Sequence, residues 1–527
     1  MELIKKNIHM DQITCSAMTQ ITLEDDMNVP DNRPDMESII FNQGNVQLNE
    51  IKAGEDRAHI NGKLNFQVLY SSDEDGRRIN VLDGSIPFQE QIYMENLHNS
   101  NAVTVKATLE DLSTSLINSR KLSVQSVVSF TVCVDDLVDE ETSVDLVNDD
   151  MGAAKIPMEY RKKTMELSEL SIQKKDVLRI KEEVQMPSEL PNIFEILWKN
   201  IDVVISEVKA MDEKLLISGE MHVFLLYEGE GEEHPIRWYE TTIPIHGEID
   251  CHGCEERFIP EVTAGINHID VEVRPDFDGE ERVVGIELPL ELQIKLYEQE
   301  HVDIVSDVYG IQNDVMAVTK KGHYKNLLIR NNGKFTLNDR VKIDGSTGRI
   351  LQICHSEGIA QIDDTKVTEN GLEIQGNILV KMLYVTNDDE NPFASTEGNV
   401  PFTYHVDVPG MTDACERKLQ LQVSEINTTM LDSESMDVKV SVLASAVVFQ
   451  PIEEEIITDV QVRELDINFM KELPSIVVYV VKDGDSLWQI GKKYYIAVDQ
   501  IKETNGLTSD HIKRGDKLLL VKTCCLE

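Results

Sequence analysis

A threefold internal repeat constrains the fold of this 527-residue chain more than any other feature of its sequence. Three segments carry an isoleucine, a glycine two residues later and a tyrosine eight residues after that: Ile60–Tyr70, Ile217–Tyr227 and Ile374–Tyr384. Their first residues are spaced by 157 positions, and the same offset relates Pro87, Pro244 and Pro401. A period this long indicates tandem duplication of whole domains, because solenoids and propellers repeat every 20 to 50 residues or so.

Apolar and polar side chains alternate within each repeated segment, and a period of two indicates half-buried β-strands. A second alternating stretch lies near the end of the repeats, at residues 284–296 and 436–442. The recurring glycine, Gly62, Gly219 or Gly376, falls on the apolar face, where it indicates a bulge or a close backbone approach. We therefore predict a mainly β chain of three antiparallel, sandwich-like domains, spanning 1–155, 156–312 and 313–470.

The charge of the chain excludes some classes of partner. It has 95 acidic and 50 basic side chains, a formal net charge of −45, which repels nucleic acids and anionic lipids. With 41% hydrophobic residues the chain can still form real cores. Two interpretations of the acidic surface remain open: it keeps the protein soluble, or it complements a basic partner.

The N-terminal residues contain no apolar run of the length of a secretory signal, and the longest apolar run is Ile476–Val481. Neither export nor a transmembrane segment is expected, and eight scattered cysteines fit a reducing cytoplasm. Phosphate-binding glycine loops and hydrolase motifs are absent from the sequence, so we expect no enzyme activity and no cofactor. Cys251 and Cys254 form the one exception, either a redox pair or half of a zinc site; His246 and His268 are the nearest further ligands.

A different pattern occupies residues 475–522, where the order strand, helix, helix, strand is predicted. Asp483 and Gly484 favour a turn, and Asp485 or Ser486 can cap the helix that follows. This segment has eight basic and six acidic side chains, so it carries about +2 while the rest of the chain carries −47. It can therefore meet an acidic protein that the rest of the chain would repel.

These 45 or so residues resemble the LysM family through the run Gly484-Asp-Ser-Leu-Trp-Gln-Ile490, the Asn505-Gly-Leu507 triplet and the ending Ile512-Lys-Arg-Gly-Asp-Lys-Leu518. The resemblance implies a βααβ fold and a shallow groove for N-acetylglucosamine polymers or for a protein partner. The implied groove comprises Asp483, Gly484, Asp485, Ser486, Leu487, Trp488, Asn505, Gly506 and Leu507. Trp488 can be a core residue or a ligand platform. The sequence departs from the family at Tyr495, where glycine is usual, and at Ala497, where threonine is usual.

Tandem β-rich repeats that end in one LysM module resemble the family of SipL-like spore coat morphogenetic proteins, with their SPOCS repeat domains. The resemblance covers nearly the whole chain. It implies a non-enzymatic adaptor in the mother-cell cytoplasm, at the forespore surface, that helps the spore coat to encase the forespore. The implied partner of the LysM module is the coat ATPase SpoIVA, and other coat proteins are implied as further partners. The alternative is a cell-wall or spore-cortex protein that binds peptidoglycan.

Overall fold

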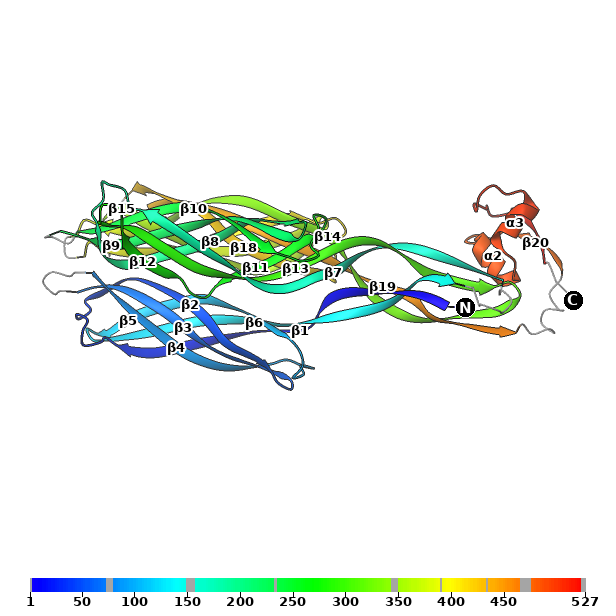
Figure 1. Cartoon of the computed structure of the whole chain (residues 1–527), viewed down its shortest axis with the longest axis horizontal. Helices are drawn as coiled ribbons and strands as arrows, with labels where there is room; N and C mark the ends of the chain where they lie inside the picture. The colour runs from blue at the N-terminus through cyan, green and yellow to red at the C-terminus, as the bar shows by residue number, and fades with distance from the viewer. Residues whose placement is uncertain are drawn as a thin grey trace.

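The computed structural model describes residues 2–72, 79–147, 157–231, 235–342, 349–388, 391–432, 435–464 and 475–522. These residues form an elongated, mainly β molecule with two short helices near the C-terminus, which confirms the predicted fold class (Figure 1). The predicted boundaries at residues 155 and 470 lie outside the described residues. The strands of the second and third repeats begin at Met158 and Asn313.

Strands of the three repeats recur in the same order. The first repeat contains β1 (Glu2–Asn28), β2 (Ser38–Ala53), β3 (Arg57–Ser71), β4 (Ile79–Tyr93), β5 (Val103–Asn118) and β6 (Lys121–Val147). The second contains β7 (Met158–Gln185), β8 (Ile193–Met211), β9 (Lys214–Gly229), β10 (Ile236–Asp250), β11 (Ile259–Ile266), β12 (Asp270–Pro275) and β13 (Glu281–Gly310). The third contains β14 (Asn313–Lys342), β15 (Ile350–Thr368), β16 (Gly371–Thr386), β17 (Phe393–Asp407), β18 (Glu416–Asp432) and β19 (Ser435–Glu464).

Each repeat folds into two antiparallel sheets. In the described part of the first repeat one sheet has the order β1-β6-β5 and the other the order β2-β3-β4. The core lies between them, with Leu64 and Phe66 of β3 packed in the same cluster as Val124 and Phe130 of β6. The second and third repeats have corresponding cores. Burial of the alternate, apolar face of each strand explains why the sequence shows a period of two.

The recurring glycine is required by a β-bulge. A side chain at Gly62, Gly219 or Gly376 would meet a backbone carbonyl oxygen of the neighbouring strand at 2.6, 2.3 or 2.1 Å. In all three repeats the pairing register shifts next to the residue opposite the glycine. Because only glycine allows such an approach, the predicted structural role of these residues is confirmed.

Long strands extend from the repeats into a common stalk. The first and last strands of each repeat pair with each other over 27 to 30 residues, as β1 with β6, β7 with β13 and β14 with β19. In Figure 1 these pairs run side by side toward the C-terminal module. Apolar side chains from all three repeats meet inside the stalk, among them Ile8, Met165 and Tyr324.

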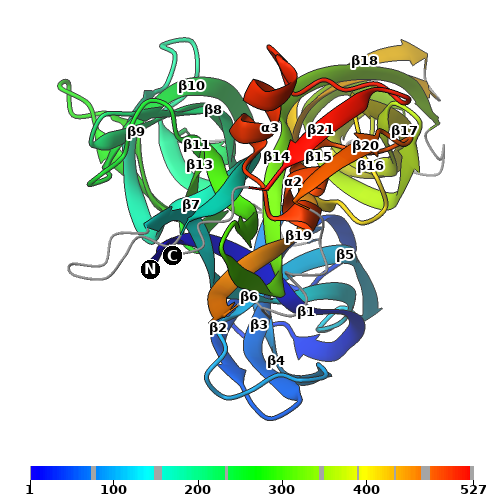
Figure 2. The ribbon, with the colours of Figure 1, turned by 90° about the vertical axis from the view of Figure 1, so that its right-hand side faces the viewer.

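The three repeats surround a common axis, which Figure 2 shows from one end as three lobes. Near the axis an apolar cluster takes Phe41 and Leu69 from the first repeat, Trp198 and Leu226 from the second and Leu383 from the third. Phe41 and Trp198 are related by the 157-residue offset, and their rings lie edge to face at 5.5 Å. Equivalent positions of the three repeats therefore pack against one another, as equivalent surfaces do in a symmetric trimer.

The C-terminal module has the βααβ order expected from the sequence. It consists of β20 (Ile476–Val480), α2 (Leu487–Tyr494), α3 (Val498–Asn505) and β21 (Lys517–Val521). Strands β20 and β21 pair antiparallel, and the two helices cover one face of the ribbon. Leu487, Ile490 and Tyr494 share one face of α2 and join the module's core, as their helical spacing predicts.

Candidate functional site

The loop before α2 is held by a network around Asp485. Its carboxylate accepts hydrogen bonds from the Tyr479 hydroxyl and from the Lys482 backbone N–H, both at 2.7 Å. These bonds lower the pKa of Asp485, and the bond to this carboxylate raises the pKa of Tyr479 to about 12. Asp485 therefore stabilises the conformation of the loop between β20 and α2.

Two further residues of the predicted groove have structural roles. The Ser486 hydroxyl accepts from the Gln489 N–H at the start of α2, and the Gln489 side chain accepts from the Ser486 N–H. The Asn505 side chain accepts from the Leu519 N–H at 2.6 Å and donates to the Leu519 carbonyl at 2.9 Å. The Asn505 amide thus binds the backbone of β21 in the way that the backbone of a neighbouring strand would, and it joins the end of α3 to this strand.

The outer part of the predicted groove is exposed. Asp483, Gly484 and Gly506 are exposed, and Leu507 is half-buried, while Leu487 lies in the core. Gly484 and Gly506 have positive φ angles of 84° and 64°, which glycine adopts without strain. The structure therefore brings these two loops to the surface of one module, and their role in binding stays a prediction.

Both departures from the family pattern are visible in the structure. Tyr495 ends α2 with a φ of 58°, a left-handed conformation that costs a non-glycine residue roughly 1–2 kcal/mol. Ala497 precedes α3 without a side-chain cap. Gly506 closes α3 in the left-handed conformation, with its N–H bonded to the carbonyls of Glu503 and Lys502.

Trp488 attaches the module to the stalk. Its indole N–H donates to the Asp307 carboxylate at 2.7 Å, and its ring lies edge to face with Tyr309 at 4.8 Å. The Arg161 guanidinium lies over the same ring, 5.4 Å from its centre. Lys492, one turn further along α2, pairs with Asp307 at 2.6 Å. Trp488 is thus neither a core residue of the module nor an open ligand platform; it is the anchor between two parts of the chain.

Tyr309 completes this contact. Its hydroxyl donates to the Ile496 carbonyl at 3.0 Å, and a side chain at Gly491 would meet the same hydroxyl at 2.6 Å. None of the hydrogen bonds and ion pairs found between module and stalk in the described ranges uses Asp483, Gly484 or Gly506. The anchor and the exposed loops therefore occupy different parts of the module.

Docking of the module is expected to weaken as the pH falls below about 4. Burial alone would raise the pKa of Asp307, but the bonds from Lys492 and Trp488 outweigh it and lower this pKa. The stabilisation is therefore fully present above the ordinary aspartate pKa and is lost as the pH falls through the lowered one. Small-angle X-ray scattering across this range should show the module leaving the stalk. The Asp307→Asn variant should lack that transition, and an equal transition in both proteins would contradict the role of Asp307.

Apolar side chains cover the outer face of the β20–β21 ribbon. Ile476 and Val478 are each 63% exposed, Val480 is 50% exposed, and Leu519 opposite Val478 is 39% exposed. We call these four residues the outer face. A contiguous apolar patch on so small a module is typical of a protein contact surface. The continuous apolar run of β20 carried this signal in the sequence, but only the structure shows which of its residues face solvent.

Cys251 and Cys254 are buried at the two ends of the exposed turn that follows β10. Burial is the main cause that raises the pKa of both thiols, to about 11 for Cys254. Both thiols are therefore less acidic than a free cysteine, unlike the activated thiolates that attack disulfides. His252 points to solvent and pairs with Glu213. Within the described ranges no three histidine, cysteine or acidic side chains converge to hold a metal ion.

Comparison with known families accounts for most of the repeated sequence. The family described as SipL, SPOCS domain, matches residues 35–117, 192–274 and 349–431, and the LysM domain family matches residues 479–521. The chain belongs to the SPOCS-domain family of the SipL type. Its three SPOCS segments begin 157 residues apart, in agreement with the period found in the sequence. Neither domain is catalytic, and their combination fits a sporulation protein with a LysM domain of the peptidoglycan-binding class.

One curated relative concerns the LysM domain alone. The probable peptidoglycan endopeptidase LytE of Bacillus subtilis (strain 168) is 50% identical over 42 residues, which are 8% of this chain and 13% of that protein. The shared part is thus a small fraction of LytE. No solved structure matches the chain. In the described residues no helix is long and apolar enough to cross a membrane.

Proposed function

We propose that this SPOCS–LysM protein is a non-enzymatic adaptor of the spore coat, which binds a SpoIVA-like coat ATPase through its LysM domain. The outer face carries this proposal, because four exposed apolar side chains on one side of the ribbon suit a protein surface better than a sugar polymer. The anchor at Trp488 supports it, because it holds the domain at the end of a long stalk. In this proposal the protein acts in the mother-cell cytoplasm, at the forespore surface.

Charge supports the same proposal. The LysM domain carries about +2 and the rest of the chain −47, so an acidic partner is attracted to the domain and repelled by the SPOCS repeats. Distance along the stalk lowers that repulsion, since screening in about 0.15 M salt acts within roughly 8 Å. In this proposal other coat proteins are additional partners of the repeats.

A second function, peptidoglycan binding, is favoured by the similarity of the LysM segment to LytE and by the exposed groove. The LysM segment shares half of its residues with LytE over the aligned 42, and Asp483, Gly484 and Gly506 of the groove are exposed. In this alternative the groove holds the glycan, and the outer face stays free. The two functions thus use different residues of the same domain, which makes them separable by substitution.

The Val478→Glu variant is expected to weaken binding of the full chain to the purified SpoIVA-like ATPase by about 30-fold, because a charge in the centre of a buried apolar contact costs roughly 2 kcal/mol. Biolayer interferometry measures this effect. The matched control is Met18→Glu, which places the same charge at a 78% exposed methionine of β1 and should leave binding unchanged.

Purified peptidoglycan provides the opposing test. If the wild-type chain binds peptidoglycan but not the ATPase, and Asp483→Ala weakens that binding while Val478→Glu does not, the adaptor proposal is wrong and the glycan function is supported. Binding to the ATPase that is lost in Val478→Glu and kept in Asp483→Ala would support the adaptor.

A further inference from the structure

A cavity of about 810 Å³ lies between the three repeats, close to the apolar axis cluster. Its walls come from β2 and β5 of the first repeat, β8, β9, β10 and β11 of the second, and β15, β16 and β18 of the third. The volume falls in the range of about 300–1,000 Å³ that small-molecule sites occupy. No step of the proposed adaptor function uses this cavity.

Equivalent positions of the three repeats carry different side chains in the wall of the cavity. Positions related by the 157-residue offset carry Gln43, Asn200 and Glu357 in one layer and Asn45, Asp202 and Ile359 in the next. The cross-strand partners of the second layer are Asn65, His222 and Leu379. The first repeat thus contributes only neutral amides to these two layers, while the second and third contribute carboxylates and a histidine. The second and third repeats thus carry ionisable groups at positions where the first repeat packs with neutral amides.

The charge inside the cavity is strongly negative. Six carboxylates and a single lysine are among the described residues that line it. The lysine, Lys381, donates to the Asn42 side chain at 3.0 Å. Asp202 forms no ion pair in the described part of the chain, and its carboxylate accepts a hydrogen bond from its own neighbour, the Val203 N–H. Asp202 therefore lines the cavity without an ion-pair partner among the described residues.

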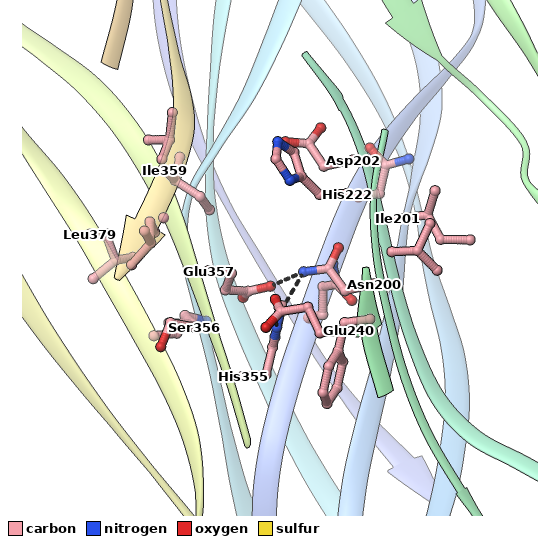
Figure 3. Close-up of a pocket in the computed structure, with 18 of the residues that line it drawn as sticks. Asn200, Ile201, Asp202, His222, Glu240, His355, Ser356, Glu357, Ile359 and Leu379 are labelled. Atoms are coloured by element: carbon pink, nitrogen blue, oxygen red, sulfur yellow. Dashed lines mark hydrogen bonds and ion pairs between the residues drawn. The ribbon is translucent and has the colours of Figure 1, made fainter. Parts of the chain in front are cut away.

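His222 supplies a second acceptor beside Asp202. Figure 3 shows the two side chains next to each other. The Nδ1 of His222 lies 3.1 Å from the Thr242 hydroxyl, whereas its buried Nε2 has no hydrogen-bond partner among the described residues. A ring whose Nδ1 carries the proton presents Nε2 as a free acceptor. A carboxylate and an imidazole acceptor together match a donor that has a positive charge and several N–H groups.

A second carboxylate faces the same cavity from the third repeat. Glu357 accepts a hydrogen bond from Asn200 at 2.7 Å, and Asn200 also contacts His355 at 3.1 Å (Figure 3). The His355 ring is stacked on Phe224 at 4.1 Å and lies 3.3 Å from Glu240. Burial is the main cause that raises the pKa of the half-buried Glu357, so a bound cation would offset the desolvation cost of this carboxylate. Asp202 lines the same cavity and is exposed, so a ligand in the cavity can reach its carboxylate.

We propose that this cavity binds a small organic amine, with one ammonium group held by Asp202 and His222 and the rest of the molecule extending toward Glu357. A protonated amine supplies the positive charge and the N–H donors that these acceptors lack. A metal ion fits poorly, because no three ligand side chains converge in the described ranges. Anions are repelled by the six carboxylates.

Calorimetric titration of the full chain with spermidine, in about 0.15 M salt, tests this proposal. One spermidine per chain should bind, and the variant Asp202→Asn/Glu357→Gln should lose affinity by about tenfold or more. The matched control, Asp83→Asn/Glu397→Gln, removes the same charge from the strand positions equivalent to Glu240, which lie outside the cavity lining. It should bind like the wild type.

A neutral substitution separates recognition from general charge attraction. His222→Leu introduces the residue type found at the equivalent Leu379, so the fold accommodates it, and it should weaken spermidine binding without changing a carboxylate. Absence of binding to the wild-type chain, equal loss in the charge-matched control, unchanged affinity in both cavity variants, or preference for citrate over spermidine would each overturn the proposal. Thermal melting confirms that each variant is folded.

Discussion

The Asp11→Asn substitution is expected to destabilise the three-repeat body by about 3–5 kcal/mol, the usual cost of removing one partner from a buried ion pair. Asp11 is 2% exposed and lies at the base of the stalk. Its carboxylate contacts the ammonium groups of Lys325, Lys295 at 2.8 Å and Lys418 at 3.1 Å. The Tyr297 hydroxyl donates to the same carboxylate at 2.8 Å.

These contacts join all three repeats. Asp11 belongs to the first repeat, Lys295 and Tyr297 to the second, and Lys325 and Lys418 to the third. Burial alone would raise the pKa of Asp11, but the three lysines outweigh it and hold this pKa far below its ordinary range. Without Asp11, the carboxylate contact left to the buried Lys325 among the described residues would be a distant one, with Glu416 at 3.9 Å. That uncompensated charge is the source of the expected loss.

Urea unfolding followed by circular dichroism measures the effect of this substitution. The control Asp139→Asn removes a carboxylate of an exposed pair with His9 and should change stability by less than about 1 kcal/mol. In the double variant Asp11→Asn/Lys325→Met part of the lost stability should return, because the unpaired ammonium is also gone. A loss below about 1 kcal/mol in Asp11→Asn would show that solvent reaches this cluster and that it does not hold the repeats together.

The Trp488→Ala substitution is expected to release the LysM domain from the stalk. Loss of the bond to Asp307 and of the ring contact with Tyr309 should shift the docked state by about 2–3 kcal/mol, or about 30- to 150-fold in population. Small-angle X-ray scattering of the full chain should then show a broader distribution of distances. The domain should stay folded, because Trp488 is not part of its core cluster.

Glu503→Ala is the control for this experiment, since Glu503 is exposed on α3 and takes no part in the hydrogen bonds and ion pairs found between module and stalk in the described ranges. Its scattering should equal that of the wild type. If Trp488→Ala unfolds the domain, the tryptophan stabilises it from within and the anchor role is wrong. Unchanged scattering of a folded Trp488→Ala variant would also contradict that role.

Some parts of the candidate site could be predicted from sequence and others could not. The two loops of the groove follow from local motifs: a turn at Asp483 and Gly484, a cap at Ser486, and a left-handed glycine at position 506. The role of Trp488 could not be read in the same way. Its partners Asp307 and Tyr309 lie some 180 residues earlier, and no local pattern indicates which surface of α2 meets the stalk.

The sequence by itself determined the period of 157 residues, the β-strands with their buried faces, the bulge at the recurring glycine and the βααβ order of the LysM domain. These features depend on side-chain alternation and turn preferences over a few residues, which act in the same way in every repeat. Only the tertiary structure decided how the repeats surround one axis, why Asp11 faces Lys325 across 314 positions, and where the acidic cavity lies. Such contacts depend on the relative placement of whole domains, because equivalent positions such as Asp11 and Lys325 become partners only when similar surfaces of different repeats meet.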